Sequence, residues 1–253
     1  MKITIATLFP KMIESFINES IIKRAQEKGF VEIEIVNPRD YATDAYKTVD
    51  DRPYGGGAGM VMKVDVISAL LRDVKKRTAE DTKMKTVLTS ARGIPYTQQK
   101  AQEYALLDHL VILAGHYEGF DERVSEYVDE ELSVGDYVLT GGELPAAVVL
   151  DSVVRLLTGV LKKDDAAKNE SFFELPIESV MAAVGEDAQL SELLANGRTT
   201  VRLIEYPHYT RPEEYEGKKV PSILLSGDHA KIDRWRIQQA YELTKRRRPD
   251  LLK

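Results

Sequence analysis

The stretch HLVILAGHYEGF, residues His109 to Phe120, indicates the fold class of this chain. Its first half, His109 to Ala114, is a short apolar run that is typical of a buried strand, and Gly115 then begins a glycine-bearing turn. In open α/β sheets, ligands bind outside the carboxyl ends of the strands, where glycine lets the backbone approach a ligand closely. The stretch therefore predicts a buried strand that leads into a binding turn.

Two further strands in the sequence end in the same way. The strand Thr86 to Ser90 leads into Arg92-Gly93, and a strand near Ser133 to Leu139 precedes Gly141-Gly142. Three such turns on neighbouring strands could together form one pocket from backbone donors and acceptors. Each turn taken alone is equally compatible with an ordinary strand-to-helix connection.

Helical periods separate the strands along the first part of the chain. Apolar spacing predicts helices over Met12 to Lys28, Val64 to Lys76, Thr97 to Leu106 and Leu144 to Leu157, and alternation predicts further strands over Lys2 to Leu8 and Val31 to Val36. Strands that alternate with helices predict a mostly parallel α/β sheet. Residues Pro38 to Met62 show no period and contain GGGAGM, so a long loop is expected there.

The C-terminal part has a different character. Lys162 to Glu174 is polar and lacks a period, Ile177 to Leu194 has helical spacing broken by Gly185, and His229 to Arg247 is helical. We therefore expect one α/β domain over residues 1–161, a linker with a possible extra helix over 162–205, and a small C-terminal helical domain over 206–253.

Composition narrows the chemistry. The chain has no cysteine, which excludes disulfides, thiolate nucleophiles and cysteine-based metal sites, and which fits a reducing cytoplasm. No apolar run suggests a signal peptide or approaches the ~20 residues that span a bilayer, so no membrane partner is expected. The nucleotide signatures G-x-G-x-x-G and G-x-x-x-x-G-K-[ST] are missing, as is the G-x-S-x-G elbow of hydrolases.

Charge is unevenly distributed along the chain. The formal net charge is −6, which by itself argues against a nucleic-acid partner. His116 to Pro145 holds nine acids and one arginine, whereas Lys231 to Lys253 holds eight bases and three acids. The basic C-terminal end could contact phosphate, or it could be an ordinary solvated helix end.

Six segments of the sequence, in order through nearly the whole chain, closely resemble the bacterial tRNA guanine-37 N1-methyltransferase family, TrmD. They are TVDDRPYGGGAGM (Thr48 to Met60), GHYEGFDERV (Gly115 to Val124), SVGDYVLTGGELPA (Ser133 to Ala146), DSVVRLLTGVL (Asp151 to Leu161), PHYTRP (Pro207 to Pro212) and LLSGDHAKIDRWR (Leu224 to Arg236).

The resemblance implies a SPOUT fold, an α/β domain with a parallel sheet and a deep trefoil knot, which is a rare exception to the rule against knotted chains. In this family the knot holds S-adenosylmethionine. Carried over position by position, the implied cofactor-binding residues are Leu88, Thr89, Ser90, Gly115, Tyr117, Glu118, Ser133, Val134, Gly135, Tyr137, Leu139, Gly141 and Gly142. They fall on the three glycine turns described above.

The resemblance also implies a homodimer whose active site forms across the subunit interface, with the C-terminal domain gripping the anticodon arm of tRNA. Arg155 takes the role of the catalytic arginine, and the catalytic base falls at Glu170, where the family usually has aspartate. Asp164 and Asp165 lie nearby in the sequence but do not align with that position.

Other departures from the family pattern are Ala58, where proline is more usual, and a long segment from Glu174 to Glu205. The family is also considered Mg²⁺-dependent, and the acid-rich run Glu118 to Glu143 could supply carboxylates, but no metal ligand is assigned. Two alternative functions stay open: another SPOUT methyltransferase that acts on a ribose 2′-hydroxyl or a different base, and a non-catalytic RNA-binding protein.

Overall fold

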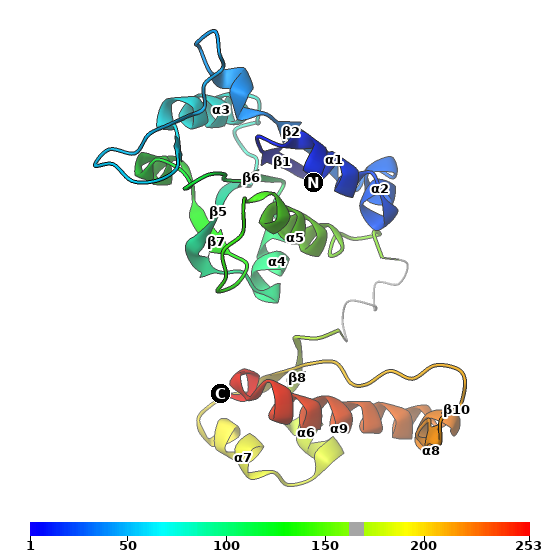
Figure 1. Ribbon diagram of the computed structural model, residues 1–253. Helices are drawn as coiled ribbons and strands as arrows, with labels where there is room; N and C mark the ends of the chain where they lie inside the picture. Colours follow the sequence, from blue (N-terminus) through cyan, green and yellow to red (C-terminus); the bar gives the residue numbers. More distant parts are fainter. Residues whose placement is uncertain (162–169) are drawn as a thin grey trace. The chain divides into compact units, whose positions relative to one another are not determined.

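The computed structural model describes residues 1–161 and 170–253 of the chain and divides it into two compact units, Met1–Lys162 and Lys163–Lys253 (Figure 1). Each unit has its own hydrophobic core. Asp164, Asp165 and most of the polar stretch expected as a linker lie outside the described residues. None of the helices in the described ranges combines the length and the apolar character that a membrane span needs.

A five-stranded sheet forms the centre of the first unit (Figure 1). Its strand order is β2-β1-β6-β5-β7, and every neighbouring pair is parallel. The strands are β1 (Lys2–Ala6), β2 (Glu32–Val36), β5 (Met84–Pro95), β6 (His109–Leu113) and β7 (Glu130–Ser133). The predicted α/β fold with a parallel central sheet is confirmed.

Alternation along the strands sends side chains to two cores, because successive residues of a strand point to opposite faces. Ile3 and Ile5 of β1 pack into the core that α1, α2, α4 and α5 cover, whereas Ala6 packs on the other face, in the core that α3 covers. These helices are α1 (Pro10–Ile17), α2 (Ser20–Glu27), α3 (Val64–Lys76), α4 (Gln98–Ala105) and α5 (Glu143–Val154). Because helices cover both faces of the sheet, the ends of its strands are the part that the helices leave uncovered.

Three predicted elements differ clearly from the structure. The strand expected over Thr86 to Ser90 continues to Pro95 as β5, so the expected Arg92-Gly93 turn lies inside the strand. The helix expected over Met12 to Lys28 is two helices, because the chain breaks the helical path after Ile17 and Ser20, the first residue of α2, takes a left-handed backbone conformation (φ 50°). The strand expected over Ser133 to Leu139 ends at Ser133, since its next residues bury no face, and Val138 is 88% exposed. The helix and the Ser133 strand were predicted wrongly for the same reason, that an apolar period does not record where the chain turns.

The expected long loop over 38–62 holds only short elements. They are a 3₁₀ turn η1 (Pro38–Tyr41) and a small antiparallel hairpin of β3 (Asp50–Asp51) and β4 (Val61–Met62). A second 3₁₀ segment, η2 (Glu122–Tyr127), connects β6 to β7.

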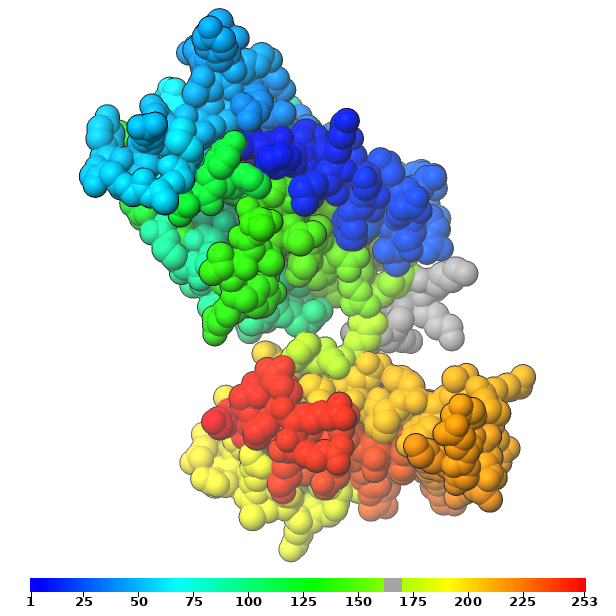
Figure 2. Space-filling model, viewed as in Figure 1, coloured from blue at the N-terminus to red at the C-terminus, as the bar shows by residue number. Residues whose placement is uncertain are grey.

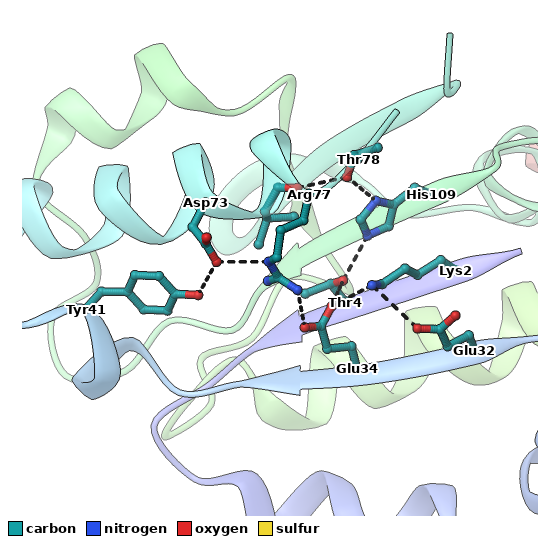
Figure 3. Close-up of polar contacts among 10 residues, drawn as sticks. Lys2, Thr4, Glu32, Glu34, Tyr41, Asp73, Arg77, Thr78 and His109 are labelled. Atoms are coloured by element: carbon teal, nitrogen blue, oxygen red, sulfur yellow. Dashed lines mark hydrogen bonds and ion pairs between the residues drawn. The ribbon is translucent and has the colours of Figure 1, made fainter. Parts of the chain in front are cut away.

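A polar cluster fixes the amino end of the sheet to α3 (Figure 3). Glu34 of β2 accepts hydrogen bonds from Lys2 (2.9 Å) and from Arg77 (2.6 Å), which follows α3. His109, the first residue of β6, is buried beside the Thr4 hydroxyl (2.8 Å), and burial together with the charge of Lys2 lowers its pKa. The charged side chains of this cluster thus pair with one another at the amino ends of the strands, and the glycine turns lie at the opposite ends.

The second unit combines two small two-stranded sheets with helices (Figure 1). Strands β8 (Phe173–Pro176) and β9 (Thr200–Leu203) pair antiparallel, as do β10 (Glu214–Tyr215) and β11 (Lys218–Lys219). The helices are α6 (Ile177–Val184), α7 (Ala188–Ala195), α8 (Ser222–Leu225), α9 (His229–Arg247) and the 3₁₀ segment η3 (Pro249–Leu252).

Residues 173–203, expected within a linker, contribute to the core of the second unit. Val180 of α6, Leu190 of α7 and Leu203 of β9 are buried with Tyr241 of α9. Asp187, at the start of α7, accepts from the Tyr241 hydroxyl (2.7 Å) and from Lys245 (2.8 Å). Burial opposes ionisation of Asp187, but these hydrogen bonds lower its pKa to about 2. The segment is therefore held to α9 by both apolar and charged contacts.

Candidate active site

A cavity of about 360 Å³ lies at the carboxyl ends of β6 and β7, beside residues 88–92 in the middle of β5, where the pairing with β7 shifts register. The sheet order is β6-β5-β7, so the turns that follow β6 and β7 meet over the middle of β5. Every residue implied as cofactor-binding lines this cavity: Leu88, Thr89, Ser90, Gly115, Tyr117, Glu118, Ser133, Val134, Gly135, Tyr137, Leu139, Gly141 and Gly142. The structure thus brings the set together, while their binding role remains a prediction.

The loop after β7 runs back past β5 to the turn after β6. Gly142 N donates to Gly115 O (2.6 Å), and His116 pairs with Gly141 in an isolated β-bridge. A Cβ added at Gly142 would lie 2.6 Å from the backbone nitrogen of Gly115 and would also meet the Thr89 hydroxyl. Glycine is required at Gly142 because the two turns touch through their backbones.

The glycine-rich loop before β4 forms a wall beside the same turn. Glu118 N donates to Met60 O (3.0 Å), and Met62 N donates to Gly119 O (2.8 Å). Gly59 has a left-handed backbone (φ +82°), and a Cβ there would collide with the Glu118 side chain. In the sequence, only the family resemblance and the glycines drew attention to this loop. The close approach of Gly59 to Glu118, which lines the cavity, explains why one of those positions is glycine.

A buried carboxylate beside an imidazole was not found from the sequence. Glu143, the first residue of α5, is 2% exposed and accepts from the Thr7 hydroxyl (2.8 Å). His116 Nδ1 lies 3.8 Å from the other Glu143 oxygen and has no hydrogen-bond partner among the described residues. His116 and Glu143 lie in two of the family segments quoted above, but their separation in the sequence does not show that the two side chains come close together. Their proximity joins the turn after β6 to the start of α5.

The cavity wall carries an excess of negative charge. Its acids are Glu118, Asp121, Glu122 and Glu131, whereas Arg92 is the one lysine or arginine among the described residues that line it. Arg92 already donates from both terminal nitrogens to Glu122 (3.1 Å each). The Arg123 guanidinium, which donates to Asp121 at 2.7 Å, lowers the pKa of that carboxyl. The wall therefore favours a ligand that carries positive charge.

No group of three or more acids or histidines within residues 1–161 and 170–253 is arranged to hold a metal ion. Within the acid-rich run, Glu130 accepts from Lys85 and Lys100 (2.9 Å each) and from Tyr104 (2.7 Å). Burial opposes ionisation of Glu130, but the hydrogen bond from Tyr104 and the two ammonium groups lower its pKa to about 2. This acid stabilises the fold and is a poor candidate for a metal ligand.

The two predicted catalytic residues belong to different units. Arg155 caps the C-terminus of α5, where its backbone N–H donates to Asp151 O (3.1 Å), and it is half-buried. Glu170 stands at the start of the described part of the second unit, where its carbonyl accepts from Phe173 N (3.1 Å). Their joint role in one reaction stays a prediction.

Comparison with known proteins gives a match along the whole chain. Residues 1–253 match the family described as tRNA (Guanine-1)-methyltransferase TrmD. A protein of Geobacter sulfurreducens, named tRNA (guanine-N(1)-)-methyltransferase, is 48% identical over 253 residues, which are 100% of this chain and 91% of the relative.

Two further relatives carry the same name. The protein of Bacillus subtilis is 44% identical over 254 residues, with 100% of this chain and 93% of the relative covered. That of Endomicrobium trichonymphae is 42% identical over 259 residues, with both chains fully covered. Because the match spans both units and the cavity turns, the chain belongs to the tRNA (guanine-1)-methyltransferase family TrmD.

Proposed function

We propose that this protein transfers a methyl group from S-adenosylmethionine to N1 of the guanosine at position 37 of tRNA, next to the anticodon. The observation that carries the proposal is the cavity at the ends of β6 and β7 and beside β5, which collects every residue that the family resemblance implies for the cofactor. Since its substrate is tRNA, the protein is expected to work in the cytoplasm.

The cavity residues fit S-adenosylmethionine. A volume of about 360 Å³ lies within the ~300–1,000 Å³ range of small-molecule sites. Leu88, Leu139 and Pro145 offer apolar wall for an adenosine, and the excess of carboxylates suits a ligand with a sulfonium and an ammonium group. We further propose that the loop from Gly135 to Gly142, which returns from β7 to the Gly115 turn, closes the trefoil knot of the SPOUT fold.

The reaction needs a base and a positive charge from the chain. S-adenosylmethionine supplies an electrophilic methyl group on a positively charged sulfur. Guanine N1 carries a proton at neutral pH, and in the proposal Glu170 removes it as general base. Negative charge then grows on guanine O6, where the guanidinium of Arg155 stabilises it. N1 becomes the nucleophile that accepts the methyl group.

An exposed apolar face on the first unit supports a homodimer. Met12 and Phe16 of α1 are 50% and 37% exposed, and Leu144 and Val148 of α5 are 57% and 50% exposed. Phe9, just before α1, adds a ring that is 40% exposed. The two helices contact each other, so these side chains come from adjacent elements. Patches of this kind mark interaction sites, and we propose that a second copy of the chain covers this one.

Arginines at the end of α9 are proposed to contact tRNA phosphates. Arg246 and Arg247 are exposed, whereas Arg248 is held by Asp250 (2.9 and 2.6 Å) and lies 5.5 Å from the Phe172 ring. Among these three consecutive arginines, we therefore assign the phosphate contact to Arg246 and Arg247, because Arg248 is already paired with Asp250.

Replacing Arg246 and Arg247 together by alanine is expected to weaken tRNA binding and to reduce the slope of log affinity against log salt by up to ~2, since each phosphate that a protein neutralises adds about 0.7–0.9 to that slope. Fluorescence anisotropy with labelled tRNA over a salt series measures the slope. Arg248→Ala is the matched control and should change the slope less. An unchanged slope in the double variant contradicts the assignment.

One assay tests the proposed activity. The full chain is incubated with labelled S-adenosylmethionine and tRNA transcripts that carry guanosine or adenosine at position 37, and the RNA is digested to nucleosides. The expected product is 1-methylguanosine, from the guanosine transcript alone. A 2′-O-methylated nucleoside would support the activity of another SPOUT methyltransferase. Binding of tRNA and S-adenosylmethionine without methyl transfer would support a non-catalytic RNA-binding protein. Parallel reactions with Mg²⁺ and with a chelator test the magnesium requirement that the resemblance implies.

A further inference from the structure

We propose that the second unit contains a binding cleft for an unpaired nucleobase of the RNA substrate. This inference rests on the proposed function only in taking RNA as the ligand. The cleft has a volume of about 720 Å³ and lies between the segment after β9 and the C-terminal half of α9. The Ile204 N–H donates to the Thr244 hydroxyl (2.9 Å) and so holds this segment against α9. In Figure 2 the atoms of the second unit run from yellow through orange to red at the C-terminus.

Aromatic rings gather along the segment after β9. The rings of Tyr206 and His208 have centroids 4.8 Å apart, and the Tyr209 ring lies 6.4 Å from that of Trp235. The guanidinium of Arg236 lies 5.2 Å from the centre of the Tyr206 ring. Such rings and guanidinium planes are the surfaces on which unstacked RNA bases stack.

Exposure identifies the rings that are available to a ligand. The side chain of His208 is 62% exposed and Tyr209 is 49% exposed, although both line the cleft. Neither ring belongs to the core of the second unit. An exposed aromatic pair that is not needed for packing fits a stacking surface.

Polar groups of two kinds border the same cleft. Glu205 accepts from His208 (2.7 Å), and together with Gln239 it can hydrogen-bond the edge of a base. Arg246 and Arg247 also line the cleft and can contact the adjoining phosphate. Stacking, edge recognition and a phosphate contact in one place match a nucleotide better than a peptide.

Trp235 gives a direct readout, because it is the single tryptophan of the chain. Anticodon stem-loop RNA added to the full-length protein should change its fluorescence in a saturable way. The double variant His208→Ala/Tyr209→Ala is expected to bind this RNA about tenfold more weakly. Its salt slope should stay unchanged, in contrast to the Arg246 and Arg247 variant, because stacking involves no charge.

Two controls separate stacking from other effects. Tyr215→Ala removes a tyrosine ring that is more exposed than Tyr209, at 64%, and that lies at the β10–β11 hairpin outside the cleft, and it should leave affinity unchanged. His208→Phe/Tyr209→Phe keeps both ring faces while losing the bond to Glu205, and should retain most of the affinity. Equal losses in the Tyr215 variant, or wild-type affinity in the alanine double variant, would overturn the proposal.

The RNA supplies the decisive comparison. A series of stem-loops, each with one abasic loop position, should contain one member that binds the wild type and the alanine double variant equally, since its stacked base is already gone. If the wild type binds every abasic RNA more tightly than the alanine double variant does, no single base occupies the cleft and the inference fails. This binding test is independent of methyl transfer, so failure of the proposed activity would be recognised separately.

Discussion

Replacing Glu170 by glutamine is expected to slow methyl transfer by about 10²- to 10⁴-fold, with tRNA and cofactor affinities close to those of the wild type. Glutamine keeps the size of the side chain but cannot take the proton from guanine N1. Because the carboxylate acts in the transition state and contributes little to ground-state binding, the loss should appear in the rate of the chemical step.

Single-turnover kinetics with saturating enzyme measure that step. Glu174→Gln is the matched control, because Glu174 is an acid of the same region that pairs with Arg202 at 2.8 Å, and it should react at the wild-type rate. Glu170→Asp would shift the carboxylate by about 1 Å, a misplacement that can cost ~10²-fold. A wild-type rate for Glu170→Gln would eliminate this residue and make Asp164, Asp165 and Asp50 the next bases to test.

The sequence predicted elements whose pattern is local. Helices α3 and α9 begin and end at the predicted residues, because their apolar spacing is uninterrupted. The strands β1, β2 and β6 were found from short β-branched or apolar runs. The glycine turns after β6 and β7 predicted one pocket, since the ends of parallel strands lie at the same side of a sheet, but the third expected turn, at Arg92-Gly93, lies inside β5.

Contacts between distant residues could not be predicted in this way. The approach of Gly142 to Gly115 depends on the path of a whole loop, and no spacing between the two residues encodes it. The same holds for His116 beside Glu143, and for the pairing of Phe173 with Leu203 that draws the expected linker into the second unit. Each of these contacts is tertiary, and tertiary context overrides local pattern.

Replacing Gly142 by alanine is expected to lower S-adenosylmethionine affinity by up to about 100-fold. The added Cβ would lie 2.6 Å from Gly115 N and 2.8 Å from the Cα of Ala114, so relief requires movement of backbone. Overpacking of this kind costs about 3 kcal/mol at the upper end of its range, which is roughly 100-fold in binding. The Gly142 backbone itself (φ −84°) is open to alanine, so the effect is steric.

Gly141→Ala is the matched control for this prediction, because the three atoms nearest to its Cβ belong to the side chains of Glu143 and His116 and not to backbone. Calorimetric titration of both variants with S-adenosylmethionine should rank Gly142→Ala well below Gly141→Ala, and thermal unfolding checks that each variant is folded. If folded Gly142→Ala bound the cofactor as the wild type does, the close approach of the two turns would not shape the pocket. The two neighbouring glycines thus test different contacts. At Gly142 the added methyl group meets backbone, and the backbone must move to relieve the overlap, whereas at Gly141 it meets side-chain atoms, which can shift without moving the backbone.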